Sequence, residues 1–97
     1  MTRSTTTVVT PNASKYLTQL SKHWSHRFPD LTYTAERADI PLPGGPCVLT
    51  ADPEALHIVI DGSDAQTAER LEGVVAEHLR RFAFREDLTF DWVREAG

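Results

Sequence analysis

The sequence has little that would link it to export or to a membrane. Cys47 is the only cysteine, so no disulfide can form within the chain. No stretch approaches the roughly 18 apolar residues that a membrane-spanning helix requires. Residues 4–9 near the N-terminus are too polar for the apolar part of a signal peptide. These absences predict a soluble protein of the cytoplasm, where thiols stay reduced.

Clustered positive charge is absent too. The formal net charge is −4 at pH 7, from 10 Lys and Arg against 14 Asp and Glu. The basic residues are scattered, and Arg80 and Arg81 are the only adjacent pair. Phosphate backbones and anionic lipid surfaces are bound by clustered cations. We therefore expect neither a nucleic acid nor a membrane as partner.

The composition is that of a globular protein with one core. The chain has 97 residues, of which 40% are hydrophobic and 25% are charged, both ordinary values for folded domains. Two domains would each fall below the size at which a core stabilises itself. We predict a single α+β domain over residues 1–97.

Two segments have the apolar spacing of amphipathic helices. The first helix is predicted over residues 11–28, with Thr10 as N-cap and Pro11 at the first helical position. The second is predicted over residues 63–84, with Ser63 and Gln66 forming a capping box. The apolar stripes contain Ala13, Tyr16, Leu17, Leu20, Trp24 and Phe28 in the first helix, and Ala68, Leu71, Val75, Leu79 and Phe82 in the second. Opposite the second stripe, Glu69, Glu72 and Glu77 are expected to form a solvated face.

The remaining segments alternate between apolar and polar residues, as strands do. Strands are expected at residues 4–9, 31–36, 40–42, 47–51, 56–60 and 88–92. Short connections at residues 43–46 and 52–54 contain Pro or Gly, which favours antiparallel hairpins. The pattern predicts a two-layer α+β sandwich with a mainly antiparallel sheet and both helices on one face. The helix-free sheet face, with Val48, Thr50, His57, Val59 and the edge residues Thr32 and Thr34, would then be open to a protein partner or a second copy.

Three segments resemble a family of short bacterial proteins known only as a conserved domain of unknown function. They are residues 16–24, 43–47 and 78–86, which together span nearly the whole chain. The resemblance implies a compact fold like that of TATA-binding-protein-like domains. It also implies an association with siderophore-handling genes, but no established activity. Family members often carry cysteine where this chain has Ser21, which argues against an essential thiol there.

Two histidines form the main candidate site. His23 and His78 lie on the flanks of the two predicted helices, and side-by-side helices would bring their rings together to bind a metal or another ligand. Cys47 is a candidate third metal ligand. In the alternative interpretation both histidines are structural, each half-buried against the core with a hydrogen-bond partner. His26 is expected at the surface, and His57 on the far face of the sheet.

Cys47 has a structural interpretation as well. It alternates in phase with Leu49 and Ala51, which predicts a buried and inert thiol. Arg85 follows the second helix and is a candidate for binding an anion through a bidentate guanidinium. Gly44 and Gly45 lack the lysine and the strand-to-helix context of a phosphate-binding loop, so a hairpin turn explains them.

Three classes of function remain open. A non-catalytic binding or accessory domain, linked through the resemblance to ferric-siderophore handling, is favoured because the sequence has no catalytic motif and implies no cofactor. A small metal-binding protein would use His23, His78 and Cys47. An enzyme with an unrecognised site is the third class.

Overall fold

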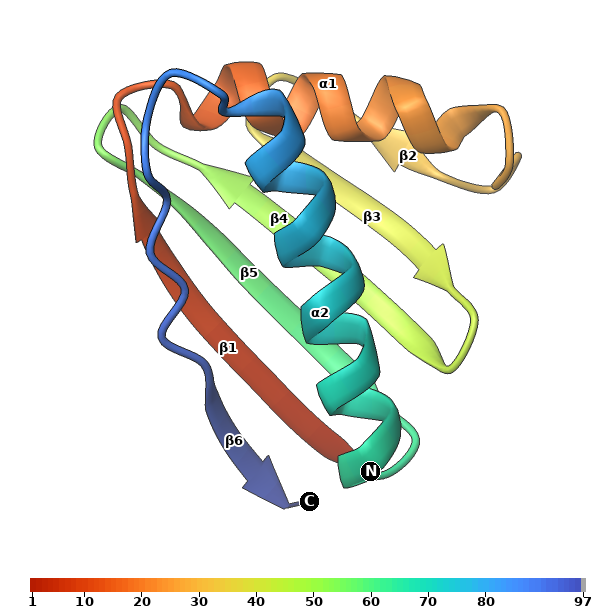
Figure 1. Cartoon of the computed structure of the whole chain (residues 1–97). Coiled ribbons are helices and arrows are strands. Elements are labelled where there is room, and N and C mark those ends of the chain that lie inside the picture. Colours follow the sequence, from red (N-terminus) through yellow and green to blue (C-terminus); the bar gives the residue numbers. More distant parts are fainter. Residues whose placement is uncertain (97) are drawn as a thin grey trace.

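An antiparallel sheet forms one layer of the structure and two helices form the other (Figure 1). The computed structural model describes residues 1–96. Within them the strands are β1 (Thr2–Val9), β2 (Thr32–Tyr33), β3 (Arg37–Leu42), β4 (Gly45–Ala51), β5 (Ala55–Gly62) and β6 (Val93–Ala96). The helices are α1 (Ala13–Ser25) and α2 (Ala65–Phe82). The predicted two-layer α+β sandwich is confirmed.

The strand order in the sheet is β2-β3-β4-β5-β1-β6. Strands β2 to β5 follow one another as an antiparallel meander, as the short connections predicted. Strand β1 lies between β5 and β6, with Thr2 opposite Gly62 and Val9 opposite Ala55. The first strand along the chain therefore occupies an inner position of the sheet.

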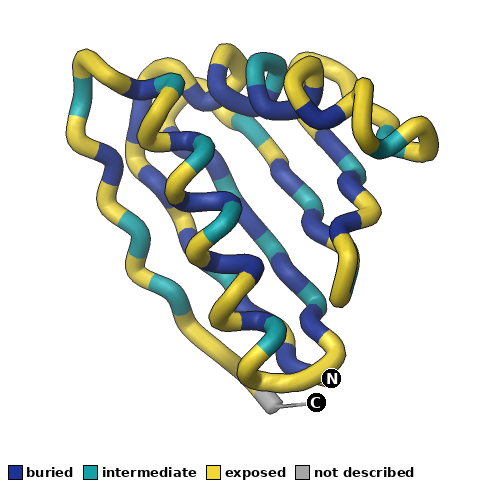
Figure 2. The backbone as a smooth tube through the Cα atoms, turned by 45° about the vertical axis from the view of Figure 1, so that its right-hand side comes forward, coloured by how far each residue is buried: buried dark blue, intermediate teal, exposed yellow. Residues whose placement is uncertain are grey.

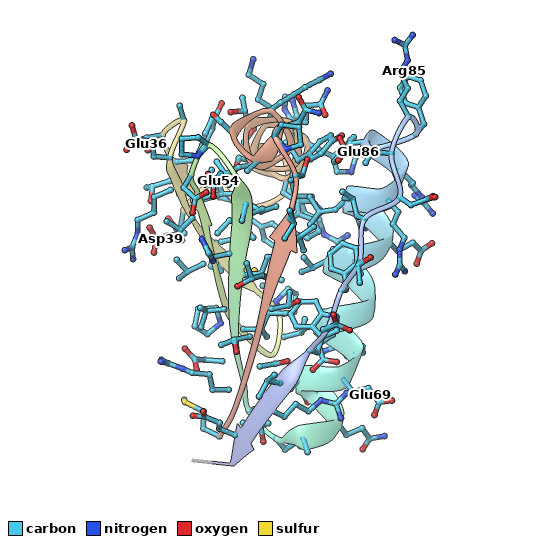
Figure 3. All side chains as sticks on the ribbon, turned by 90° about the vertical axis from the view of Figure 1, so that its left-hand side faces the viewer. Glu36, Asp39, Glu54, Glu69, Arg85 and Glu86 are labelled. Carbon is cyan, nitrogen blue, oxygen red and sulfur yellow. The ribbon has the colours of Figure 1, made fainter. Side chains whose placement is uncertain are left out.

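The core lies between the sheet and the helices. Buried positions alternate along β1, β3, β4 and β5, and they recur once per turn on the helices (Figure 2). The view along the sheet in Figure 3 shows both helices on the same side of it. The largest fully buried apolar side chains are Val8, Leu17, Leu20, Ile40, Leu49, Leu56, Ile58, Ile60, Leu71, Val75 and Leu79. Both predicted helical stripes therefore face the sheet, although Phe82 is only half-buried, since it lies where the edges of the two helices meet.

Both helices are shorter than predicted. Helix α1 ends at Ser25, so Phe28 lies after the helix and not in its apolar stripe, and α2 ends at Phe82. Both also begin later than predicted. Thr10 Oγ1 accepts a hydrogen bond from the Asn12 N–H at 3.1 Å, so residues 10–12 form a turn and α1 starts at Ala13. The capping box at Ser63 is also wrong. Asp64 is the N-cap of α2, because its carboxylate accepts a hydrogen bond from the Thr67 N–H at 2.7 Å. A carboxylate one residue further along thus replaces the predicted serine cap.

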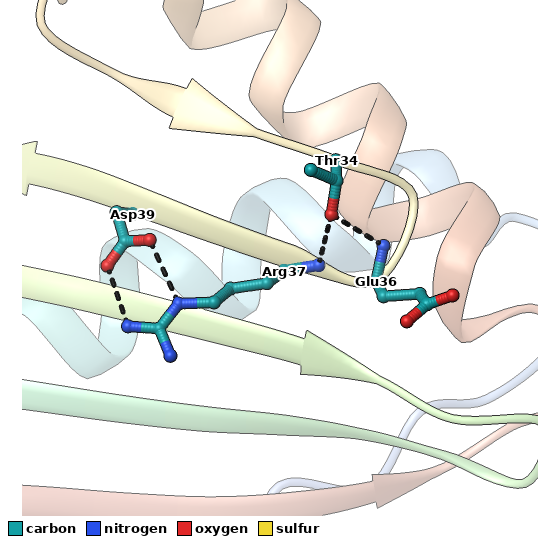
Figure 4. Close-up of polar contacts among 4 residues, drawn as sticks. All are labelled: Thr34, Glu36, Arg37 and Asp39. Atoms are coloured by element: carbon teal, nitrogen blue, oxygen red, sulfur yellow. Dashed lines mark hydrogen bonds and ion pairs between the residues drawn. The ribbon is translucent and has the colours of Figure 1, made fainter.

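Two predicted strands differ in the structure. Of residues 31–36 only Thr32–Tyr33 pairs, and both side chains are exposed rather than half-buried. The chain turns at Thr34, whose Oγ1 accepts hydrogen bonds from the Glu36 and Arg37 N–H groups at 3.2 Å (Figure 4). Residues 88–92 have no strand pairing, and the last strand is Val93–Ala96. Their apolar side chains pack on the core without a backbone ladder.

An ion pair with a buried carboxylate attaches β6 to α2. Glu72 is 5% exposed and receives two hydrogen bonds from Arg94, at 2.7 and 2.8 Å. Ser4 of β1 donates a third. The Arg94 hydrogen bonds hold the pKa of Glu72 below its ordinary value. Placing Glu72 on a solvated face was therefore wrong, because the last strand covers that part of α2.

Neither helix among the described residues has the length and apolarity needed to span a membrane.

Candidate functional site

The two helices and the turn between β3 and β4 enclose a small cavity, here called the interhelical cleft. Its volume is about 160 Å³. Helix α1 and the turn after it contribute Trp24, Arg27 and Phe28, and the β3–β4 turn contributes Leu42 and Pro43. Helix α2 contributes Arg70, Leu71, Val74 and His78. Helix α1 runs across one end of the sheet, while α2 runs along it (Figure 1).

The wall of the cleft is aromatic and held in place by packing. Trp24 is 4% exposed, because it ends the buried stripe of α1. Its ring meets the Phe28 ring edge-on, with centroids 6.2 Å apart, and lies 5.0 Å from the His78 ring. Edge-to-face rings at these separations attract one another beyond simple burial. The wall is therefore fixed before any ligand arrives.

The structure brings His23 and His78 together, although α1 and α2 run in different directions instead of side by side (Figure 1). Their ring centroids lie 5.6 Å apart. His78 is half-buried, and its Nδ1 lies 2.7 Å from the Val74 carbonyl oxygen. A carbonyl only accepts, so Nδ1 donates to it, and Nε2 is the ring nitrogen left for a ligand. His23 contacts Phe82 but is exposed; the expectation that it is half-buried was wrong, since its flank of α1 faces water.

Cys47 does not join the histidines. It lies on β4 between Ile40 and Ile60 and is 0% exposed, and burial raises the pKa of its thiol to about 12. Among residues 1–96 no group of three or more His, Cys, Asp or Glu is arranged to hold a metal ion. The prediction of a buried Cys47 is confirmed, and at neutral pH its sulfur stays protonated.

Arg85 and the other two histidines lie elsewhere. Arg85 points away from the body of the molecule (Figure 3), with its guanidinium 5.4 Å from the centre of the neighbouring Phe84 ring. His26 is exposed, as expected. His57 lies on the helix-free face, where Nε2 is 2.7 Å from Asp52 Oδ2. The candidate anion site at Arg85 is therefore separate from the interhelical cleft.

Arg27 and Arg70 were not singled out in the sequence, yet both line the cleft. Arg27 places its guanidinium 5.7 Å from the Phe28 ring centre, and Arg70 donates a hydrogen bond to the Pro43 carbonyl at 3.3 Å. Within the described part of the chain neither has a carboxylate partner. One signal was available: Arg70, Val74 and His78 follow each other at intervals of four, so they share one flank of α2.

A larger hollow of about 520 Å³ lies at the opposite end of α1. It is lined by loop residues that include Ser14, Ala35 and Asp52. Ser14 Oγ donates to the Ala35 carbonyl, and Asp52 accepts from two backbone N–H groups and contacts His57. Both polar side chains already have hydrogen-bond partners within the protein, and no aromatic ring lines the hollow, so the interhelical cleft is the better candidate site.

The helix-free face of the sheet contains Val48, Thr50, His57 and Val59, as predicted. Its charged groups bond to each other. Arg3 pairs with Asp61 at 2.8 Å, and Arg37 pairs with Asp39 through two hydrogen bonds of 3.0 and 3.1 Å (Figure 4). Binding of a partner or a second copy to this face stays a prediction.

Glu86 forms a polar cluster next to α1 (Figure 3). Its carboxylate accepts hydrogen bonds from Thr10 Oγ1 at 2.7 Å, from Asn12 Nδ2 at 2.8 Å and from the Tyr16 hydroxyl. The bond from Tyr16 is the main reason why the pKa of Glu86 lies below its ordinary value. Burial is the main cause of the raised pKa of Tyr16. The cluster fastens the segment after α2 to the start of α1.

This cluster predicts a pH-dependent contribution to stability. The carboxyl of an unfolded glutamate has a pKa of about 4.3. Because the pKa of Glu86 is lower in the folded protein, its ionised carboxylate stabilises the fold above that pH. This stabilisation is lost as the pH falls through the folded-state pKa. Glu86→Gln should cost about 1–2 kcal/mol at pH 7 and much less at pH 3. Urea denaturation at both pH values measures this. Glu69→Gln is the control, because Glu69 has no hydrogen-bond partner among the described side chains, and an equal loss at both pH values would contradict the assignment.

Comparison with known proteins gives two matches. The sequence pattern of a family described as "Uncharacterized protein conserved in bacteria (DUF2218)" matches residues 5–93. A solved structure, the NMR structure of PA4090 from Pseudomonas aeruginosa, is 35% identical, covers 96% of each chain and superposes with a TM-score of 0.80. No curated protein matches the sequence.

Proposed function

Since this chain belongs to the uncharacterized bacterial family DUF2218, whose description states no activity, we propose from its own geometry that it is a non-catalytic binding domain. The ligand site is the interhelical cleft. The observation that carries this proposal is the pairing of a fixed aromatic wall at Trp24 with two arginines that have no carboxylate partner among the described residues. Ligand sites combine apolar walls with a few convergent polar groups in this way.

The arrangement of possible nucleophiles favours binding over catalysis. Cys47 is buried, and Ser21 and Ser25 donate their hydroxyl protons to helix carbonyls. Thr7 and Asp52 do flank His57, at 3.2 and 2.7 Å. Thr7 and His57 are direct partners in the β1–β5 register, and neither residue lines the interhelical cleft or the larger hollow. A cross-strand hydrogen-bond chain explains these contacts.

A more specific proposal is that the domain handles ferric siderophores in the cytoplasm. This proposal comes from the family resemblance, and the volume of the cleft limits how much of such a ligand can be enclosed. A volume of about 160 Å³ is below the range of roughly 300–1,000 Å³ in which whole drug-sized ligands are enclosed. The cleft would therefore hold one arm of such a ligand and leave the iron centre outside.

Metal binding through His23 and His78 is the second candidate. The 5.6 Å separation of the ring centroids supports it, as does the free Nε2 of His78. With Cys47 buried in the sheet, the remaining ligands would be water or groups of a bound molecule. This arrangement suits a weak site better than a structural zinc site.

The binding proposal predicts that small molecules bind at one place. We expect a library of small aromatic and aliphatic fragments, screened by NMR against the ¹⁵N-labelled chain, to shift the amides around Trp24 and His78. Zn²⁺ and a ferric siderophore are added as separate samples. A Zn²⁺ response that His23→Ala abolishes would favour the metal-binding candidate. A library in which no fragment shifts the cleft amides would reject the binding proposal.

A further inference from the structure

The interhelical cleft also indicates what class of ligand it selects. We propose that it binds small aromatic carboxylates, with the ring against Trp24 and Phe28 and the carboxylate between Arg27 and Arg70. This inference rests on the proposed function and names the chemistry of its ligand.

The size of the cleft sets the first requirement. A volume of about 160 Å³ is close to the roughly 150 Å³ at which an apolar protein cavity accommodates benzene. One six-membered ring therefore matches the volume of the cleft. Leu71, Val74 and Leu42 complete an apolar lining around the ring.

The aromatic wall sets the second requirement. Phe28 contacts the Trp24 ring edge-on, and His78 contacts it at a tilted angle. A ligand ring that enters among them finds both faces and edges at the distances that aromatic pairs prefer. A flat ring therefore suits this wall better than a branched aliphatic chain of the same volume.

The charge at the cleft sets the third requirement. Arg27 follows α1 and Arg70 lies on α2, so the cavity is lined by one arginine from each of two elements. Among the described residues Arg3, Arg37, Arg81 and Arg94 each have a carboxylate partner, whereas Arg27, Arg70, Arg80 and Arg85 have none. Of these four, Arg27 and Arg70 line the cleft. Two unpaired guanidiniums in a chain of net charge −4 offer a carboxylate charge-assisted hydrogen bonds from two sides.

The β3–β4 turn holds Arg70 in position. Arg70 donates to the Pro43 carbonyl at 3.3 Å, and its Nη2 would lie 3.0 Å from a Cβ atom at residue 44. Glycine at this position, with φ of 103°, therefore allows the guanidinium to lie against the turn. The remaining N–H groups of Arg70 are free to bind an anion.

The test compares benzoate with benzamide, which has the same ring and no charge. In NMR titrations of the full chain, benzoate should shift the amides around Trp24, Arg70 and His78, and benzamide should bind at least about tenfold more weakly. Arg27→Gln and Arg70→Gln should each weaken benzoate binding by about tenfold, the loss expected for one charge-assisted hydrogen bond. Arg81→Gln is the matched control, because Arg81 pairs with Glu77 at 2.9 Å and does not line the cleft.

Each other outcome has a defined meaning. If benzamide binds the cleft as tightly as benzoate, or if both arginine variants keep full affinity, the carboxylate proposal is wrong while the binding function stands. If benzoate shifts amides around Arg85 instead, the assigned site is wrong. If no fragment of the library shifts the cleft amides, the binding function fails together with this inference.

Discussion

Leu79→Ala is expected to lower the free energy of unfolding by about 2–5 kcal/mol, the usual cost of removing a leucine side chain from a close-packed core. Leu79 is 0% exposed and faces the sheet from the middle of the core cluster. Domains of this size are stable by about 5–15 kcal/mol in total, so this one change removes a large share. Urea denaturation followed by far-ultraviolet circular dichroism measures the loss.

Glu77→Ala is the matched control on the same helix. Glu77 is exposed and pairs only with Arg81 one turn away, so its loss should change stability by less than about 0.5 kcal/mol. Wild-type stability of Leu79→Ala would show that the buried face of α2 is assigned wrongly.

Gly45→Ala is the second substitution with a large expected effect. Gly45 begins β4 with φ of 154°, and a Cβ atom there would lie 1.9 Å from the Asp61 carbonyl oxygen. Because the obstacle is backbone on the neighbouring strand, neither side can move without breaking the sheet. We expect a loss of about 3–5 kcal/mol, from steric strain together with an unfavourable φ.

A second glycine-to-alanine substitution, in the helix that contains Leu79, is the control for Gly45→Ala. Gly73 lies inside α2, and nothing lies within 4 Å of a Cβ built there. Gly73→Ala should therefore stabilise the protein by about 0.5–1 kcal/mol through helix propensity. Chemical denaturation should show a lower free energy of unfolding for Gly45→Ala and a higher one for Gly73→Ala. Equal free energies of unfolding for the two variants would contradict the geometry.

Much of the fold was predictable because a long run of apolar residues at helical spacing fits few structures other than an amphipathic helix. Leu20 and Trp24 in α1, and Leu71, Val75 and Leu79 in α2, were placed correctly on the buried faces. Short alternating segments predicted less well. Residues 31–36 and 88–92 alternate in the same way as real strands, and only their neighbours in space decide whether they pair.

The candidate site was predicted only in part for a similar reason. The flank positions of His23 and His78 follow from helical geometry, and the structure brings them together. The buried position of Cys47 followed from its alternation with Leu49. The roles of Arg27 and Arg70 depend on where the β3–β4 turn lies against α2, and no local pattern contains that information.

The inner position of β1 has a consequence for how the chain folds. The hydrogen-bond partners of β1 come from β5, more than half the chain away, and from β6. Contacts between such distant residues carry a high loop-closure cost and slow folding.

During synthesis β1 leaves the ribosome with both edges unpaired, and it stays unpaired until β5 has followed. A Thr- and Val-rich strand in that state is a template for pairing with another chain. We therefore expect aggregation to compete with folding until β5 docks onto β1.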